Sequence, residues 1–483
     1  MGSTCEVDVT VVGSGPNGLA AAVVCARAGL SVQVLEAQST LGGGARTLPD
    51  PDFPGVLHDV CSAVHPLALG SPLFAEFDLA ARGVKLAVPE ISYANPFVDR
   101  AAAIAYRDFD RTCEGLDDGK TWRRLLEPMV RRSDSVVDFL LGDKRSLPKD
   151  PVSVLRLGLR MAWQGTPAWN ATFEGRDAEA LFTGVAAHTI SPLPSITSAA
   201  AGMLLASLAH SDGWPIPVGG SQAIADALIA DLRAHGGVLH TDTEVTAPPE
   251  GVVLFDTAPT ALLTIYGDRL PGGYAKRLQR YRFGSGVAKV DFVLSDDVPW
   301  SDPRLASAAT FHLGGDRVDM AHAEALVAAG RHAERPMVLA ALPHVADPGR
   351  VDDAGRRPFW TYAHVPAGST IDQAQAVAAV IESFAPGFRD IVVATRSVPA
   401  AQMVEHNANY VGGDIAVGGN NAFRALAGPT PRLNPWAAPL PGVYLCSSAT
   451  PPGAGVHGMA GYYAARTLLR REFGIKDTPD LAT

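Results

Sequence analysis

The sequence predicts an α/β fold, and three observations support that prediction. Residues 7–12 are rich in β-branched side chains and end at a glycine, which indicates a short buried strand. Residues 19–28 are helix formers that stop at Gly29, and residues 31–35 indicate a second strand that ends at Glu36. Near the other end of the chain, residues 442–446 indicate another buried strand, followed by a glycine-rich turn and a helix over 458–473. The order strand, turn, helix, strand is typical of parallel strands in a βαβ unit.

The first strand leads directly into a G-x-G-x-x-G turn formed by Gly13, Ser14, Gly15, Pro16, Asn17 and Gly18. In such a turn the first glycine permits the tight bend, the second lets a pyrophosphate approach the backbone, and the third lets helix and strand pack closely. The helix that follows offers free N–H groups and the positive end of its dipole to the phosphates. Glu36 lies 18 residues after Gly18, where its carboxylate can accept both ribose hydroxyls and would repel a 2′-phosphate. The pattern predicts a Rossmann-type dinucleotide site.

Composition narrows the class of protein. The chain has 483 residues, 47% hydrophobic and 19% charged, so global disorder is excluded. The formal net charge of −10 argues against a generic nucleic-acid-binding protein, which would carry a basic surface. The five cysteines are scattered and include no C-x-x-C pair, so we expect neither a metal site nor a disulfide framework. With no secretory signal and no apolar run of the roughly 20 residues that a membrane span needs, a cytoplasmic location is expected.

The middle of the chain shows fewer signals. Helices are expected over residues 122–142, 152–163, 198–209, 222–235 and 374–384, and strands over 287–294 and 359–365. Residues 50–97, rich in proline and glycine, are expected to be irregular, and the polar tail from Lys476 is expected to fray. Because no repeat or low-complexity linker divides the chain, we expect interleaved domains.

Two further motifs resemble those of known families. Residues 41–47 read L-G-G-G-A-R-T, and the pattern E-x5-G-G-x-A-R-T is similar to that of the flavin-containing amine oxidases and phytoene desaturases. Residues 441–459 read P-G-V-Y-L-C-S-S-A-T-P-P-G-A-G-V-H-G-M. This segment resembles the closing motif of phytoene-desaturase-like oxidoreductases, in particular the branch named for the pyridine nucleotide-disulphide oxidoreductase domain. The chain has no active-site cysteine pair despite that name.

The resemblance implies FAD as the cofactor and several residues that would hold it. In those families a glycine pair passes beneath the pyrophosphate and an arginine supports it, which implies roles for Ala37, Gly43, Gly44, Ala45 and Arg46. In this chain Gly44 stands where the arginine often does, and Arg46 follows two places later. An adenine contact is implied for Val245. The closing motif would bring a strand end and a helix N-terminus to the flavin, with Ser448, Gly455, His457, Gly458 and Met459. A helix dipole there would stabilise the anionic reduced flavin.

A third segment implies catalytic residues. Residues 284–294 resemble the amine-oxidase strand whose lysine is bonded through water to flavin N5, and Lys289 aligns with that lysine. A cation there would stabilise negative charge at N5 or superoxide; the alternative is a lysine that pairs with Asp291. His65 and His364 are the other catalytic candidates. His65 lies where related sequences pass close to the flavin ring.

Five residues are expected to line a substrate pocket: Ser62, Trp360, Tyr362, Asn409 and Tyr410. Trp360, Tyr362 and His364 alternate along one strand and therefore share a face. Asn409 and Tyr410 belong to an unusually polar segment beside a glycine pair, residues 405–414. For each of these residues a structural role, as a satisfied histidine or a turn-forming asparagine, is the alternative.

The resemblance extends over nearly the whole chain and implies two interleaved domains. An FAD-binding domain would comprise residues 1–60, 215–262 and 425–483, and a mixed α+β substrate domain with a helical subdomain would comprise 61–214 and 263–424. Only a short link, residues 247–251, precedes Val252, where relatives often carry a β-hairpin. The chain shows no second strand–GxGxxG–helix unit. Electrons are therefore expected to come from an organic substrate and to leave to oxygen, a quinone or another acceptor.

These observations predict an FAD-dependent dehydrogenase, desaturase or oxidase. It would take a hydride from an apolar small molecule, a polyene or isoprenoid or an amine-bearing compound. One alternative is a redox-neutral flavin-dependent isomerase or saturase, and another is a non-catalytic flavin-bound interaction protein. The sequence leaves a peripheral membrane contact and the oligomeric state open.

Overall fold

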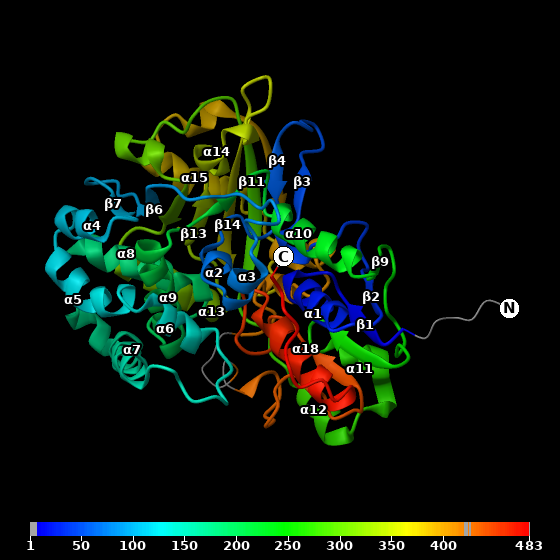
Figure 1. Cartoon of the computed structure of the whole chain (residues 1–483). Helices are drawn as coiled ribbons and strands as arrows, with labels where there is room; N and C mark the ends of the chain where they lie inside the picture. Colours follow the sequence, from blue (N-terminus) through cyan, green and yellow to red (C-terminus); the bar gives the residue numbers. More distant parts are fainter. Residues whose placement is uncertain (1–6, 420–423, 425–426, 483) are drawn as a thin grey trace.

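The computed structural model describes residues 7–419, 424 and 427–482. Its elements are arranged around two sheets, one smaller and parallel and one larger and mixed, with a helical region beside the larger sheet (Figure 1). The strands of the smaller sheet come from both ends and the middle of the sequence. The prediction of an α/β Rossmann-type fold is confirmed.

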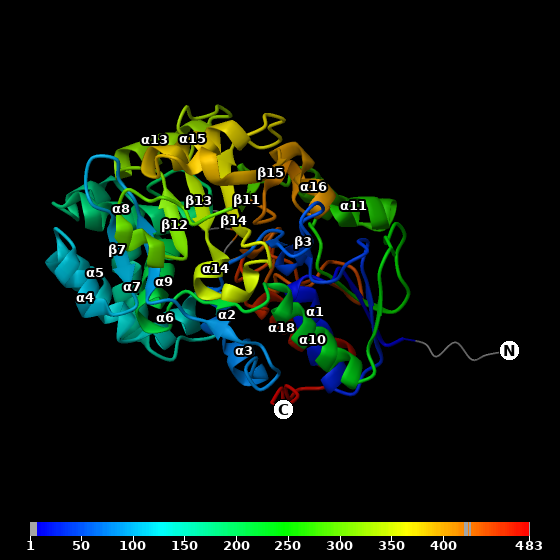
Figure 2. The same ribbon diagram turned by 90° about the horizontal axis from the view of Figure 1, so that it is seen from above.

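The smaller sheet is parallel throughout. Its strand order is β16 (Val443–Leu445), β10 (Val252–Phe255), β1 (Val9–Val12), β2 (Val32–Leu35) and β9 (Val238–His240). The central strand β1 is buried along its whole length, which explains its uninterrupted hydrophobic run. Helix α1 (Pro16–Arg27) lies between α10 (Gln222–Ala234) and α18 (Met459–Glu472), as Figure 2 shows. A side chain at Gly461 of α18 would approach the carbonyl oxygen of Asn17 to 1.9 Å, so glycine lets α18 cross α1 closely.

The larger sheet has seven strands. Their order is β15 (Val392–Val398), β11 (Gly286–Leu294), β14 (Arg357–Val365), β13 (Val338–Ala341), β12 (Thr310–Leu313), β6 (Ile91–Asn95) and β7 (Ala103–Tyr106). All neighbours are antiparallel except β12 and β6. One face packs Phe292 and Phe359 against α15 (Ala374–Phe384) in an apolar core. The opposite face, described below, is more polar.

A helical region adjoins the larger sheet. Helix α9 (Ile196–Ser211) contacts most of the others, and these are α5 (Gly119–Val130), α6 (Ser133–Leu140), α7 (Pro151–Gln164) and α8 (Arg176–Ala186). Shorter helices complete this region and the connections, namely α2 (Pro66–Leu69), α3 (Pro72–Phe77), α4 (Phe109–Gly115), α11 (Ala261–Tyr266), α12 (Gly272–Gln279), α13 (Arg317–Ala328), α14 (Pro343–Ala346) and α16 (Met403–His406). No helix among the described residues is long and apolar enough to cross a membrane.

Three sequence expectations are corrected. The helix expected over residues 122–142 is two helices, α5 and α6, because the backbone leaves helical geometry at Arg132. Within α5, Pro128 has no N–H to donate to the carbonyl of Arg124, and this carbonyl accepts a hydrogen bond from Arg160 at 3.3 Å instead. Residues 50–97 are not irregular, because they contain α2, α3, β6 and two short strands, β4 (Leu57–Asp59) and β5 (Leu86–Ala87). The first pairs with β3 (Thr47–Pro49) and the second with the distant β8 (Ile216–Pro217). The tail folds back, since Arg27 and Arg82 donate to carbonyls of residues 480–482.

Candidate active site

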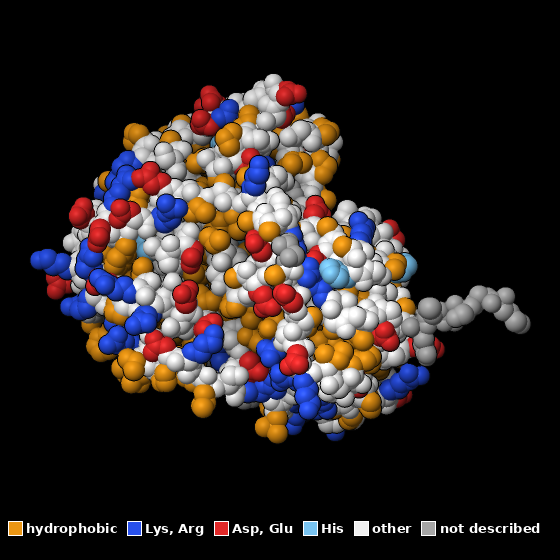
Figure 3. Space-filling model, in the orientation of Figure 1, with side chains coloured by type: hydrophobic (Ala, Val, Ile, Leu, Met, Phe, Trp, Pro, Cys, Tyr) orange, Lys and Arg blue, Asp and Glu red, His pale blue; other side chains and the backbone are white. Residues whose placement is uncertain are grey.

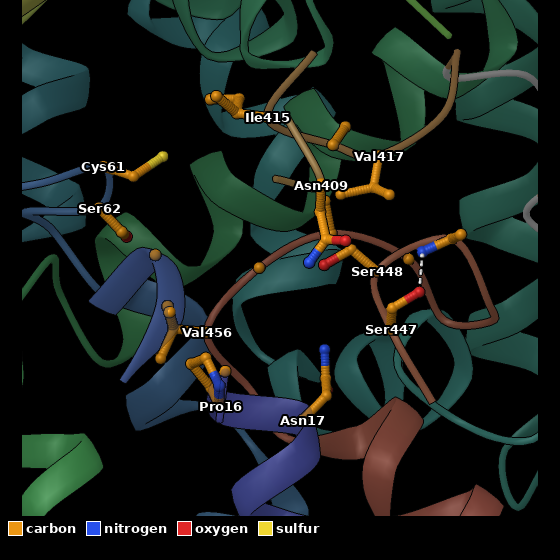
Figure 4. Close-up of a pocket in the computed structure, with 18 of the residues that line it drawn as sticks. Pro16, Asn17, Cys61, Ser62, Asn409, Ile415, Val417, Ser447, Ser448 and Val456 are labelled. Carbon is orange, nitrogen blue, oxygen red and sulfur yellow. Dashed lines mark hydrogen bonds between the residues drawn. The ribbon is translucent and has the colours of Figure 1, made fainter. Parts of the chain in front are cut away.

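A cleft of about 1040 Å³ begins at the carboxyl ends of the parallel strands and continues beneath the larger sheet into the helical region. Ligands of open α/β sheets bind at this edge because the strand ends and helix N-termini converge there. In Figure 4, Asn17 of α1, Asn409 and Ser448 point toward one open space from different sides. The position agrees with the predicted dinucleotide site.

The glycine turn is built for close approach. Gly13 has φ +96°, and a side chain at Gly15 would come within 2.5 Å of Oδ2 of Asp256. A side chain at Gly18 would come within 2.3 Å of the carbonyl oxygen of Gly13. All three positions therefore need glycine, as the motif predicts. Gly18 itself is not among the cleft-lining residues of the described chain, since its N–H is turned to Asp256 at 2.9 Å.

Glu36 is fixed at the end of β2. Its Oε2 accepts from the backbone N–H and the hydroxyl of Ser14 at 2.8 and 2.6 Å, and its Oε1 accepts from the N–H of Gln38 at 2.9 Å. It lines the cleft together with Ala37 and, farther along, Val245. Of the two lone-pair sites on each carboxylate oxygen, both on Oε2 and one on Oε1 are used, so a ribose hydroxyl could still donate to Oε1.

The second glycine segment packs against the first. A side chain at Gly43 would lie 2.7 Å from the Cα of Gly15, and one at Gly44 would lie 2.2 Å from the hydroxyl of Tyr410. Arg46 is buried and donates to the carbonyl of Gly43 at 2.8 Å and to the hydroxyl of Thr40 at 2.9 Å, as well as to a carbonyl of α16. Gly43, Gly44, Ala45 and Arg46 all line the cleft. A guanidinium has five N–H donors, so Arg46 keeps donors for a phosphate.

A carboxyl group that the sequence analysis missed lies at the glycine turn. Asp256 directly follows β10, and besides accepting from Gly18 it lines the cleft. Burial, with the nearby charge of Glu36 as a smaller contribution, raises the pKa of Asp256 to about 8. Because β10 neighbours β1 in a parallel sheet, the rule that strand ends share one edge is the signal that could have found it.

The closing motif contributes its first half to the cleft. Ser448 and Gly455 line it, whereas His457, Gly458 and Met459 are not among its lining residues in the described chain. His457 instead holds the turn: its Nδ1 accepts from the N–H of Met459 at 3.0 Å and its Nε2 bonds the carbonyl of Gly453 at 3.2 Å. Burial lowers the pKa of His457 to about 4. Its contacts are structural, and direct cofactor contact by these three residues stays a prediction.

Lys289 is buried on β11 and forms an ion pair with Asp291, the alternative that the sequence left open. Its Nζ lies 5.1 Å from the ring centroid of Trp360. Lys289 is not among the cleft-lining residues that the structure describes, although its neighbour Trp360 is. Burial lowers the pKa of Lys289, opposed by Asp291. Its role at flavin N5 stays a prediction.

His65 lines the cleft with one ring nitrogen free. Ser221 donates its hydroxyl proton to the carbonyl of Ser62 at 2.5 Å, so its oxygen can only accept from His65 Nε2 at 2.7 Å. That contact places the proton on Nε2 and leaves Nδ1, which makes no hydrogen bond within the described chain, as an acceptor. Burial lowers the pKa of His65 to about 4, so the ring is neutral at physiological pH.

His364 lies behind the cleft wall. Its Nδ1 bonds Glu324, its ring stacks on Tyr362 at 5.7 Å between centroids, and it is not among the lining residues of the described part. A direct catalytic role for His364 stays a prediction. All five residues expected in the substrate pocket line the cleft, namely Ser62, Trp360, Tyr362, Asn409 and Tyr410. Asn409 also bridges the loop after β10, because its Oδ1 accepts from the N–H of Ala258 at 2.8 Å.

Beyond the strand ends the cleft becomes apolar. Its walls there come from α6, α7 and α9 and the segment between α8 and α9, which contribute Phe139, Leu140, Met161, Ile190, Ile196, Ala200, Ala201, Leu204 and Leu205. The sequence analysis missed these residues because a helix face that lines a cavity has the same pattern as one that lines a core.

Comparisons with known proteins agree with this architecture. A family model described as an NAD(P)-binding Rossmann-like domain matches residues 11–76. The chain is 24% identical over 547 residues to pyridine nucleotide-disulfide oxidoreductase domain-containing protein 2 of Rattus norvegicus, across 96% of this chain and 94% of that protein. Hydroxyneurosporene desaturase of Rhodobacter capsulatus is 53% identical over 49 residues, 10% of each chain.

The fold is shared with solved structures. A putrescine oxidase bound to putrescine superposes with a TM-score of 0.59 at 15% identity, covering 96% of this chain and 98% of that one. The resemblance inferred from the glycine pair and the closing motif is thus confirmed. The chain therefore has a Rossmann-type dinucleotide-binding domain, is similar to oxidoreductases of the phytoene-desaturase type and shares the fold of the amine oxidases.

Proposed function

We propose that this protein is an FAD-dependent dehydrogenase, desaturase or oxidase that takes a hydride from an apolar small molecule. The observation that carries the proposal is the continuity of the cleft, which joins a dinucleotide-type glycine turn to an apolar chamber between helices. A flavin bound with its pyrophosphate at the turn would supply hydride acceptance.

The residues present fit FAD. Gly13, Gly15 and Gly43 line the cleft, and a side chain at any of them would clash with Asp256 or with the backbone of Gly15. Glu36 would meet a ribose, and Arg46 lies beside the turn. The same residues disfavour NADP, whose 2′-phosphate would meet the Glu36 carboxylate. Flavin rather than a nicotinamide is supported by the E-x5-G-G-x-A-R-T pattern and the closing motif.

The chemistry expected from the protein is positioning and exclusion of water. His65 Nδ1 is an unprotonated acceptor at the cleft wall, and Trp360 and Tyr362 form an aromatic surface with ring centroids 5.0 Å apart. The ammonium of the buried Lys289–Asp291 pair lies 5.1 Å from the centroid of the Trp360 ring. Balanced by Asp291, it would contribute local electrostatic stabilisation near the reacting end of the cleft. We propose oxygen or a quinone as electron acceptor, in line with the single glycine-turn unit in the sequence.

An apolar substrate is also favoured by the surface of the helical region. Helix α7 exposes Val152, Leu155, Leu159 and Trp163 along one side, and the preceding Leu147 is 93% exposed. Figure 3 shows hydrophobic side chains gathered along the lower left edge over α7, with Lys and Arg among them. Met161 of the same helix lines the cleft. We propose that this face makes a peripheral contact with an anionic membrane, from which an apolar substrate enters.

Extraction and anaerobic titration test the proposal. The protein purified from a heterologous host should release FAD, identified by mass spectrometry. Anaerobic addition of a substrate should then bleach the flavin absorbance, which oxygen or a quinone restores. Turnover without lasting bleaching would point to the redox-neutral alternative. A purified chain that binds no FAD when the cofactor is supplied would refute the proposed function.

A further inference from the structure

The face of the larger sheet that is turned toward the cleft is polar in an unusual way. Strand register places Thr310, Ala341 and Trp360 in one row, and His312, Leu339 and Tyr362 in the next. Directly opposed residues of antiparallel strands share a face. A buried sheet face in an enzyme core would normally be apolar, so the polar side chains in these rows require partners.

For two of these side chains no partner is found among the residues that the structure describes. Thr310 and Trp360 are 5% and 6% exposed, both line the cleft, and neither the Thr310 hydroxyl nor the Trp360 indole N–H has a hydrogen-bond partner among the described residues. Burying a polar group without a partner costs roughly 1–3 kcal/mol. The small side chain of Ala341 lies between them in the row but is not among the cleft-lining residues of the described chain, so the two polar groups flank this alanine at the cleft wall.

A pair of histidines, His188 and His312, lies next to the row of Thr310 and Trp360. His188 lines the cleft from the segment after α8, and its Nε2 lies 2.8 Å from Nε2 of His312 on β12. Because Nε2 of His188 is engaged, Nδ1 is the nitrogen it can offer to a ligand. The ring of His312 has room at this position because residue 184 is glycine, since a side chain there would come within 2.7 Å of the ring.

The charge state of the residues at this end disfavours an ionic ligand. Burial lowers the pKa of His188 to about 3 and the pKa of His312 well below its ordinary value, so both rings are neutral. The charged groups nearby already have partners, since Lys289 pairs with Asp291 and the Glu324 carboxylate bonds His364 Nδ1. The two rings of a neutral pair share one proton between their facing nitrogens, so His188 Nδ1 donates in one tautomeric arrangement and accepts in the other.

We propose that Thr310, Trp360 and His188 form a polar anchor for an uncharged oxygen, a hydroxyl or a carbonyl, carried by an otherwise apolar substrate. The Trp360 N–H donates to that oxygen, the Thr310 hydroxyl donates or accepts, and His188 follows the tautomer that the oxygen requires. The anchor rests on the proposed function, because it assigns this end of the cleft to substrate. It disfavours an amine, whose ammonium group would be desolvated against neutral rings without a carboxylate to balance it.

A matched set of probes tests the anchor by binding alone. The flavin-loaded protein is titrated anaerobically with octan-1-ol, octylamine and oct-1-ene, followed by tryptophan fluorescence and calorimetry. We expect octan-1-ol to bind about tenfold more tightly than oct-1-ene, and octylamine at neutral pH to bind no better than oct-1-ene. Thr310→Val and Trp360→Phe should each weaken octan-1-ol about threefold to tenfold and leave oct-1-ene unchanged.

The controls separate the possible failures. Thr264→Val removes a hydroxyl that lines the cleft from α11, near the parallel sheet, and should change none of the affinities. Thr310→Val is isosteric and removes a hydroxyl with no partner in the described chain, so it should fold. Equal affinities for alcohol and alkene, or unchanged alcohol affinity in both variants, would overturn the anchor. Absence of flavin binding, read from absorbance, would instead count against the proposed function.

Discussion

Replacing Asp256 with asparagine should abolish one pH dependence of this protein's stability. The Asp256 carboxyl lies against the glycine turn, where Oδ2 accepts from the Gly18 N–H at 2.9 Å, and its pKa is raised from 3.8 to about 8. In the unfolded chain the carboxyl has its ordinary pKa, so the folded state binds the proton more tightly. The stability gained from that proton is complete below pH 3.8 and is lost as pH rises through about 8.

The magnitude follows from the same values. Between about pH 6 and pH 9 a folded-state pKa near 8 corresponds to a loss of roughly 2.7 kcal/mol, at about 1.4 kcal/mol per pKa unit. Asp256 is partly exposed to the cleft, and water there screens the charge. We therefore expect the free energy of unfolding to fall by about 1–2.5 kcal/mol over this interval.

Urea unfolding of the flavin-free protein at these two pH values measures the effect. Asp256→Asn keeps an oxygen that can accept from Gly18, so it should fold and should lack this part of the pH dependence. FAD affinity should weaken above pH 8 in the parent, because an ionised Asp256 then faces the pyrophosphate, and should not weaken in the variant. Equal pH slopes in the two proteins would refute the placement of a neutral carboxyl at the turn.

Three further predictions follow from the site. Glu36→Ala should weaken FAD by about 1.5–3 kcal/mol, because a charged acceptor of the ribose hydroxyls is lost; equilibrium dialysis measures it, and unchanged occupancy would contradict the role of Glu36. Acid precipitation should leave all flavin in the supernatant, since Cys446 is buried and burial raises its pKa well above the ordinary value; yellow colour in the pellet would show a covalent link. Lys289→Met should slow flavin reoxidation by oxygen about tenfold or more, as measured by stopped-flow mixing. The same substitution should lower the free energy of unfolding by about 3–5 kcal/mol, because it leaves the buried Asp291 unpaired. Adding Asp291→Asn to the Lys289→Met variant should restore the stability but not the reoxidation rate. An unchanged reoxidation rate in Lys289→Met would show that the role of the lysine is structural.

The dinucleotide end of the site was accessible from the sequence because its chemistry is local. The turn of Gly13, Gly15 and Gly18, the strand on each side and Glu36 lie within about 30 consecutive residues, and each residue type is required by backbone geometry or by the charge of the ligand. Helices with clear periodicity, such as α10 and α15, were placed almost to the residue. The boundaries of residues 50–97 were missed because two-residue and four-residue elements there depend on distant partners, such as Leu86 with Pro217.

The cleft residues that the sequence analysis missed were decided by tertiary structure. Asp256, His188 and Thr310 come from three distant parts of the chain and meet only because sheet order and strand register bring them to one cleft. The two-residue period of a strand predicts a common face for Trp360, Tyr362 and His364, and these residues alternate along β14. Whether a side chain on that face reaches the cleft depends on what packs over it: Trp360 and Tyr362 line the cavity, whereas His364 lies against Glu324. Periodicity fixes direction along one element, but burial and partners are set by the other elements, and no local pattern contains them.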